Sequence, residues 1–164
     1  MSDGQRSVVV APGDGTTIEG PVGGPLTFKV RGDQTGDALT AFENVIPPGE
    51  GPPMHVHAHE DESWYVLEGE LRFALDGDLA TASTGAFVFV RRGTPHCFQN
   101  VGAAPARILV LFAPSGMERF FERFASLPAG RFDPESFRTA GAEAGMEVVG
   151  PPLAVSHPPE RRPA

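Results

Sequence analysis

Three histidines and one glutamate have the residue types and the spacing of a metal site. His55 and His57 are separated by one residue, Glu62 follows shortly after them, and His96 stands at the start of a later apolar segment. Side chains at positions i and i+2 of a strand point to the same side, so a strand over 55–57 directs both imidazoles one way. If a neighbouring strand brings His96 opposite this pair, the three imidazole nitrogens and one carboxylate oxygen come together. Such a set of ligands suits a divalent first-row transition metal.

The polar residues around this set have a plainer interpretation, because histidines in a polar loop often contact only water. His59 continues the alternation of the pair, but the run HEDE predicts a bend, so we expect His59 to face solvent or to support the ligands from behind. We expect Glu60 and Asp61 to be solvated. His157 lies in a proline-rich tail and is not an expected ligand.

Composition and charge exclude several classes of partner. The chain has 164 residues and a formal net charge of −8, so it repels phosphate backbones and anionic lipids, and we expect no nucleic acid and no membrane as partner. The single cysteine, Cys97, cannot form an internal disulfide, which fits a reducing compartment. No stretch approaches the roughly 20 apolar residues that span a bilayer, and the N-terminal apolar run is too short for a signal peptide. We therefore expect a cytoplasmic protein.

The middle of the chain reads as a series of short strands. Turn signals recur at the spacing of an all-β sandwich or barrel. The predicted strands cover 26–30, 39–46, 62–75 (two strands joined at Glu68-Gly69), 85–90, 96–102 and 106–113. The segment 85–90, GAFVFV, is rich in β-branched and aromatic residues and is expected to be buried.

The pattern changes after residue 113. Residues 115–127 have Met117 and three phenylalanines at helical spacing, with Ser115 as the expected N-cap. A second helix is expected over 134–145, with Asp133 at its cap and Pro134 in its first turn, followed by an extended proline-rich tail. We expect an N-terminal arm over 1–23, a barrel over 24–113, and helices and a tail over 114–164 that pack on the barrel.

Two longer stretches resemble the two conserved motifs of the cupin superfamily. The run G-EGPPM-H-V-H-AHED-E-SWYVLE-G, over 49–69, has every spacing of the first motif. The run G-AFVFV-R-R-G-TP-H-CFQ-N, over 85–100, fits the second motif except at Arg91, where the family usually has a proline that serves the turn. The resemblance covers about residues 24–113.

This resemblance implies an all-β fold, a jelly-roll β-barrel of antiparallel strands with a short C-terminal helical extension. It implies that His55, His57, Glu62 and His96 bind one metal inside the barrel. It marks Gly69, Gly85 and Gly93 as turn positions and Asn100 as structural. Cys97 adjoins His96 and alternation turns it away from the metal, so a structural role is expected. The resemblance also implies pairing as a homodimer, through strand exchange or sheet packing.

The ligands also indicate which neighbours face the cavity of such a barrel. Alternation from Glu62 points Trp64 and Val66 inward, and alternation from His96 points Phe98 and Asn100 inward. The expected substrate contacts are Met54, Trp64, Phe98, Phe42, Phe73 and Phe112. Each aromatic residue alone is more often core filling, but the set predicts an aromatic or apolar small organic substrate. A sugar phosphate would need inward basic groups, and Lys29 and Arg72 are expected to point outward.

Three functions are compatible with these residues. The first is a metal-dependent dioxygenase that resembles the quercetinases, in which Glu62 also accepts a proton from an enolic or phenolic hydroxyl as a catalytic base. The second is a non-redox isomerase, cyclase or decarboxylase that uses the metal as a Lewis acid. The third is a small-molecule-binding protein without turnover. The ligand set suits Fe, Mn, Co, Ni, Cu or Zn and does not choose among them.

Overall fold

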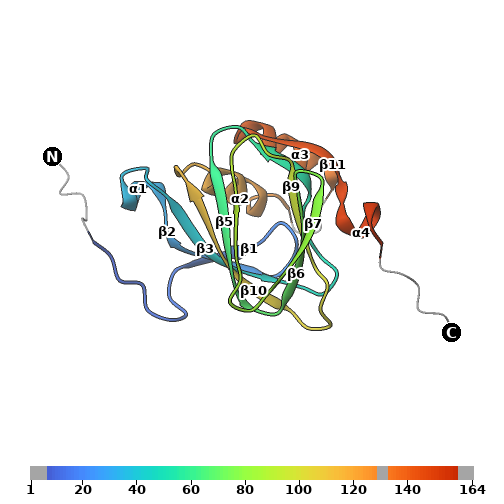
Figure 1. The fold of residues 1–164 in the computed structure, drawn as a ribbon. Helices are drawn as coiled ribbons and strands as arrows, with labels where there is room; N and C mark the ends of the chain where they lie inside the picture. Colours follow the sequence, from blue (N-terminus) through green and yellow to red (C-terminus); the bar gives the residue numbers. More distant parts are fainter. Residues whose placement is uncertain (1–6, 129–132, 159–164) are drawn as a thin grey trace.

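Two antiparallel sheets pack face to face in the computed structural model, which describes residues 7–128 and 133–158 (Figure 1). The six-stranded sheet has the order β1-β2-β3-β10-β5-β8, and the five-stranded sheet has the order β11-β4-β9-β6-β7. The strands of the first are β1 (Thr16–Glu19), β2 (Pro25–Val30), β3 (Thr40–Ile46), β10 (Ala106–Ala113), β5 (Asp61–Glu68) and β8 (Phe87–Val90). Those of the second are β11 (Met146–Pro152), β4 (Pro53–His57), β9 (His96–Asn100), β6 (Glu70–Leu75) and β7 (Asp78–Ser83). The jelly-roll prediction is confirmed.

The core lies between the two sheets, where inner strands such as β10 bury every second side chain. On β10 the alternate residues Ala106, Ile108, Val110 and Phe112 are buried, while Arg107 between them is exposed. Full burial of one such aliphatic or aromatic side chain contributes about 1.5–3 kcal/mol. This alternation also fixes which residues face the cavity between the sheets.

The turn between β5 and β6 depends on a glycine, as predicted. Gly69 has a φ of +95°, and a Cβ at this position would lie 2.9 Å from the Cβ of Ala106. A larger residue would meet both a strained backbone and a steric clash. The glycine therefore lets the chain pass beside β10 from β5 in one sheet to β6 in the other.

The prediction that the segment 85–90 is buried is wrong for its two phenylalanines. Phe87 and Phe89 on β8 are 63% and 53% exposed, whereas Val90 is buried. Within residues 7–128 and 133–158, β8 pairs with β5 alone and forms an edge of its sheet, and no element covers the outer face that carries Phe87 and Phe89. An apolar run cannot reveal from its composition which of its two faces is covered.

Two helices close one end of the barrel. α2 (Glu118–Ala125) turns Phe120, Phe121 and Phe124 inward, and Phe121 packs against Phe42 of β3 with ring centroids 4.8 Å apart. α3 (Pro134–Glu143) packs on α2 through Phe137, whose ring centroid lies 5.0 Å from that of Phe120. The helical prediction is confirmed for both segments.

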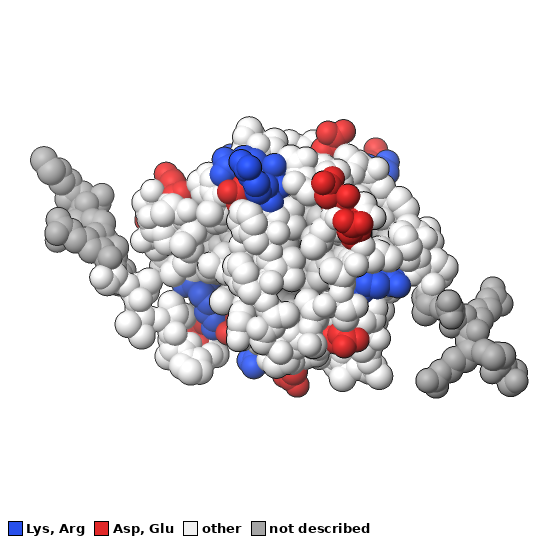
Figure 2. All heavy atoms as spheres, viewed as in Figure 1, with Lys and Arg blue, Asp and Glu red and all other residues white. Residues whose placement is uncertain are grey.

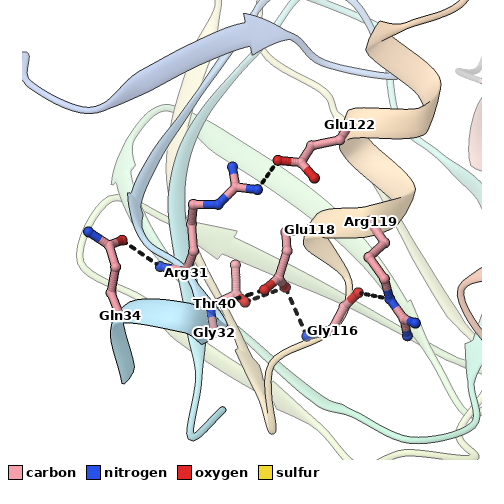
Figure 3. A network of polar contacts seen from close by, with 8 residues as sticks. All are labelled: Arg31, Gly32, Gln34, Thr40, Gly116, Glu118, Arg119 and Glu122. Carbon is pink, nitrogen blue, oxygen red and sulfur yellow. Dashed lines mark hydrogen bonds and ion pairs between the residues drawn. The ribbon is translucent and has the colours of Figure 1, made fainter. Parts of the chain in front are cut away.

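The N-caps of these helices differ in how well the sequence predicted them. The Asp133 cap is confirmed, since its carboxylate accepts a hydrogen bond from the backbone N–H of Ser136. The Ser115 cap is wrong, because α2 begins after Met117 without a side-chain cap. Instead, the carboxylate of Glu118 accepts from the backbone N–H groups of Gly116 and Gly32 and from the Thr40 hydroxyl. Gly32 begins the short helix α1 (Gly32–Thr35), so Glu118 joins α2 to the barrel rim (Figure 3).

The proline-rich tail is extended over β11, as predicted, but then forms a short helix that was not predicted. β11 pairs antiparallel with β4, with Met146 opposite His57 and Val148 opposite His55, and α4 (Leu153–Ser156) follows it. Leu153 packs against Cys97, which is buried and whose pKa burial raises to about 11. Cys97 thus has the structural environment that was predicted. The end of the tail, residues 159–164, lies outside the described residues.

The surface carries its charges in small separate groups. On the face shown in Figure 2, acidic and basic side chains surround a broad uncharged region, and no continuous basic stripe crosses it. None of the helices within the described ranges has the length and apolar character needed to cross a membrane.

Candidate metal centre

The predicted cluster is brought together between the two sheets. β4 contributes His55 and His57, β9 contributes His96 from the same sheet, and β5 contributes Glu62 from the opposite sheet. One nitrogen or oxygen from each of the four residues lies within 4.8 Å of the others, and all four are buried. These positions allow one small cation to contact all four side chains.

Two backbone carbonyls orient the imidazoles. The Nδ1 atoms of His55 and His96 lie 2.7 and 2.8 Å from the carbonyl oxygens of Pro53 and Thr94. A carbonyl can only accept a hydrogen bond, so Nδ1 carries the proton when each ring is neutral, and Nε2 is left as the ligand atom. Such a bond to the other ring nitrogen is the usual support of a metal-binding histidine.

The carboxylate of Glu62 is the point on which two imidazoles converge. Its Oε2 atom lies 3.0 Å from Nε2 of His57 and 2.9 Å from Nε2 of His96. Three of the four expected ligand atoms, two nitrogens and one oxygen, thus already lie next to one another. A bound metal would take the place of the hydrogen bonds between them.

The electrostatics of the cluster favour a negative Glu62 carboxylate beside a neutral His55. Burial alone would raise the pKa of Glu62, but hydrogen bonds from His57 and His96 outweigh it and lower this pKa to about 2. Burial, together with the nearby His96 and His57, lowers the pKa of His55 to about 3. For His96, burial opposes protonation, but the hydrogen bond to Glu62 prevails and raises its pKa. A negative charge in a buried site favours a cation at its centre.

This donor set fits a divalent transition metal. Three imidazole nitrogens and a carboxylate oxygen suit the first-row metals from Mn to Zn, and hard oxygen-seeking cations such as Mg²⁺ would have only one matching ligand. His57 differs from His55 and His96, because its Nδ1 atom is buried without a hydrogen-bond partner among the described residues. The set does not select one metal within this series.

A mainly apolar cavity of about 50 Å³ adjoins the cluster. His55, His57 and Glu62 line it, together with four of the six residues predicted to contact substrate, namely Phe42, Trp64, Phe98 and Phe112. No lysine or arginine within the described ranges is among its lining residues. Lys29 and Arg72 instead pair with Glu43 and Gln99 respectively, away from the cavity.

Two predicted substrate contacts do not line this cavity. Met54 is the immediate neighbour of His55 on β4, so the strand turns it to the opposite face, where it packs against Ala74, Cys97 and Leu153. Phe73 lies behind the lining, with its ring centroid 5.2 Å from that of Trp64 and 5.7 Å from that of Phe98. It supports the aromatic wall without facing the cavity.

Several lining residues were not predicted from the sequence. α2 contributes Met117, Phe120 and Phe121, α3 contributes Phe137, and the N-terminal arm contributes Val22. The helical phenylalanine stripe was visible in the sequence, but its spacing predicts only that the stripe is buried, not that a cavity lies beneath it. Asn44 was missed because a polar residue on a strand is usually expected to face water.

The acidic residues beside the cluster behave differently from one another. The prediction that Glu60 is solvated is wrong, since it is 2% exposed and burial raises its pKa. Gly116 lacks a Cβ, which would lie 3.0 Å from the Glu60 carboxylate, and so leaves space for this side chain. Asp61 is partly exposed and pairs with Arg92 at 3.0 Å. His59 is exposed and lies outside the four-residue cluster.

A larger groove of about 540 Å³ lies next to the cavity. The two spaces share Pro21, Val22 and Phe137 among their lining residues. On its outer side the groove is bordered by β11, including Val148 and Val149. These shared residues lie between the groove and the cavity beside the cluster.

Comparisons with known proteins agree with this architecture. Residues 42–112 match the family model described as a cupin domain. The chain is 28% identical over 94 residues to mannose-1-phosphate guanylyltransferase of Escherichia coli, which covers 54% of this chain and 20% of that protein. It is 34% identical over 76 residues to quercetin 2,3-dioxygenase of Bacillus subtilis, covering 44% of this chain and 22% of that protein.

The solved structures give the same fold. A protein from Thermotoga maritima, described as a predicted oxalate decarboxylase, superimposes with a TM-score of 0.59 at 23% identity, covering 65% of this chain and 99% of that one. The chain thus spans about a fifth of the two curated relatives named above and nearly all of this compact structure. With the two motifs, the two-sheet barrel and the buried cluster, these matches show a cupin domain over residues 42–112.

Proposed function

We propose that the protein is a metal-dependent dioxygenase that acts on an enolic or aromatic small molecule. The observation that carries this proposal is the convergence of three imidazoles and one carboxylate at the end of an apolar, aromatic cavity. The similarity to a quercetin 2,3-dioxygenase supports the same class of substrate. A bound transition metal would supply Lewis acidity toward a substrate oxygen and, if redox-active, electron exchange with dioxygen.

The side chains of this site have distinct roles in the proposal. His55, His57 and His96 hold the metal through Nε2. Glu62 holds it through its carboxylate, which in this proposal accepts the proton of an enolic hydroxyl when it leaves the metal. The aromatic wall orients a flat substrate and excludes water, which would otherwise compete for the open positions and quench reactive species.

The size of the cavity limits which part of the substrate reaches the metal. One water molecule needs roughly 10–15 Å³ measured in this way, so a space of about 50 Å³ admits only a small fragment of a molecule. A larger substrate would place its enolic end at the metal and extend past Val22 and Phe137 into the outer groove. The whole of a flavonol would require these side chains to move.

The lining argues against a sugar phosphate as substrate, although one relative acts on mannose 1-phosphate according to its name. Phosphate recognition relies on arginine, lysine or a cluster of backbone N–H groups. Within the described ranges the cavity has no lysine or arginine, and its carboxylate would repel a phosphate. The apolar substrate class is therefore the better match.

The experiment that tests the proposal is dioxygen uptake by protein reconstituted separately with Fe, Mn, Co, Ni and Cu. The substrates would be a panel of flavonols, smaller enols and catechols, with His57→Ala as the inactive control. Uptake that requires both metal and His57 would support the proposal. Turnover of the same molecules without oxygen would assign a non-redox reaction instead, and unchanged ligand after long incubation would assign a binding protein.

A further inference from the structure

Two polar side chains within the apolar cavity have no hydrogen-bond partner. Among the described residues, Oδ1 of Asn44 and Nε1 of Trp64 are buried atoms without a partner. Both residues line the cavity, and they are only 5% and 0% exposed. Buried polar groups in folded proteins are nearly always hydrogen-bonded, so each exception requires an explanation.

A second buried asparagine shows what a structural role looks like in this fold. The Nδ2 group of Asn100 donates to the carbonyl oxygens of Ile46 and Ala104, and its Oδ1 accepts from the backbone N–H of Gly102. Asn100 thereby ties β9 to the end of β3 and to the loop between β9 and β10. Asn44 makes none of these connections, although it is buried on the inner face of β3 in the same barrel.

The strand register places the two unpartnered groups at increasing distance from the metal cluster. Across β5, β10 and β3 the paired residues form three rows, Glu62–Phe112–Thr40, Trp64–Val110–Phe42 and Val66–Ile108–Asn44. Successive rows are roughly 7 Å apart along the strands. Trp64 therefore lies one row from the proposed ligand Glu62, and Asn44 lies two rows from it.

Asn44 also lies beside the N-terminal arm, where the cavity meets the outer groove. Its Oδ1 is 3.2 Å from the position that a Cβ on Gly20 would occupy, and the next residues, Pro21 and Val22, line both spaces. A ligand that extends from the metal toward the groove would pass Trp64 first and Asn44 afterwards. Its apolar part would contact the aromatic wall between them.

We propose that Asn44 and Trp64 are specificity-determining residues that hydrogen-bond a second polar group of the substrate, away from its metal-bound end. The substrate class is an elongated, mainly apolar molecule with an oxygen at the metal end and a hydroxyl, carbonyl or amide farther along. The Trp64 N–H can only donate, whereas the Asn44 amide can both donate and accept. The proposal deepens the proposed function, since it rests on a ligand occupying the same cavity.

The first test asks whether Asn44 has a structural role. Asn44→Leu and Asn100→Leu replace the same amide with an apolar side chain of similar size. We expect Asn44→Leu to leave the thermal midpoint unchanged or raise it, because no internal hydrogen bond is lost, and Asn100→Leu to lower it clearly. Equal losses in the two variants would contradict the proposal.

The second test measures ligand preference without turnover. Binding of 3-fluoro-4,4′-dihydroxybiphenyl, which has a second hydroxyl at its far end, and of 3-fluoro-4-hydroxybiphenyl, which lacks that hydroxyl, would be followed by fluorine NMR on the full chain, as purified and after saturation with zinc. The wild type should bind the dihydroxy compound at least about tenfold more tightly, and Asn44→Leu or Trp64→Phe should reduce this ratio by about tenfold, the value of one hydrogen bond. Unchanged binding of the monohydroxy compound would show that the cavity remains intact.

The outcomes separate this proposal from the proposed function. A ratio that stays the same in both variants, or a wild type that binds neither probe, would overturn the role of Asn44 and Trp64. Absence of dioxygen uptake would overturn the dioxygenase and leave the zinc-loaded measurement untouched. The proposed role of Asn44 and Trp64 can thus be refuted while the dioxygenase proposal holds, and the dioxygenase proposal can be refuted while their role holds.

Discussion

His55 and His96 are direct partners across the β4–β9 ladder, with ring centroids 4.4 Å apart. This single pairing joins the two motifs of the sequence, because one histidine comes from each. It also brings the ring nitrogens into a position where a carboxylate from the opposite sheet can meet them. The first prediction concerns the energetic consequence of burying His55.

The unfolding free energy of the metal-free protein should fall as the pH falls from about 6.5 toward 3. Burial lowers the pKa of His55 from 6.5 to about 3, so in this window the unfolded chain binds a proton there and the folded chain does not. Stability therefore rises with pH across the window, by an amount on the order of a few kcal/mol. Urea titrations at a series of pH values, with a chelator present, would measure it.

His55→Gln should flatten this dependence, and the exposed His157→Gln should retain it. Glu62 contributes in the same direction only at lower pH, because its pKa falls from 4.5 to about 2. His96 acts oppositely, since its raised pKa stabilises the folded state at low pH and this contribution is lost as the pH rises. A slope that is identical in wild type and His55→Gln would refute the assignment to His55.

Glu118→Gln should destabilise the protein by about 2 kcal/mol, the scale of hydrogen bonds to a charged group. Its carboxylate accepts from two backbone N–H groups and from the Thr40 hydroxyl, and these contacts lower its pKa (Figure 3). A glutamine has one acceptor oxygen and turns an NH₂ group toward these donors. Denaturant unfolding curves would give the change.

The matched control for this prediction is Glu122→Gln on the same helix. Glu122 pairs with Arg31 at a partly exposed position, and its side chain is 42% exposed. Ion pairs of this kind are worth only about 0–1 kcal/mol. Equal losses for the two glutamates would mean that the connection from α2 to Gly32 and Thr40 does not stabilise the fold.

Gly51→Ala should destabilise the protein by about 3 kcal/mol or more, the upper range for overpacking a folded core. A Cβ at this position would lie 1.8 Å from the carbonyl oxygen of Phe98, which is backbone and cannot move aside alone. Gly49 in the same loop has free space around it and a φ of +81°, so Gly49→Ala should cost only about 1 kcal/mol. Thermal melts of the two variants would rank them, and the reverse order would be incompatible with this packing.

The sequence predicted the cluster better than its surroundings. The spacing of His55, His57 and Glu62 depends only on strand alternation and on the motif, and both hold in the structure. The same alternation should have excluded Met54, because a residue adjacent to His55 must face the other side of β4. That error came from proximity along the chain being taken for proximity in space.

Other features could not be predicted because they depend on contacts between distant segments. The burial of Glu60 depends on the space that Gly116 leaves, and Phe87 is exposed on a face of β8 that no described strand or helix covers. Asn44 has the sequence context of a solvent-facing strand residue. Neither residue type nor periodicity distinguishes these cases without the tertiary structure.

The metal content of the purified chain tests the central claim most directly. After equilibration with excess Fe, Mn, Co, Ni, Cu or Zn and removal of unbound ions, elemental analysis should find about one metal per wild-type chain with at least one of these elements. His57→Ala and Glu62→Ala should lose it, and His59→Ala should keep it, because His59 is exposed and outside the cluster. Metal at background level in the wild type, or the same content in all four proteins, would contradict the account.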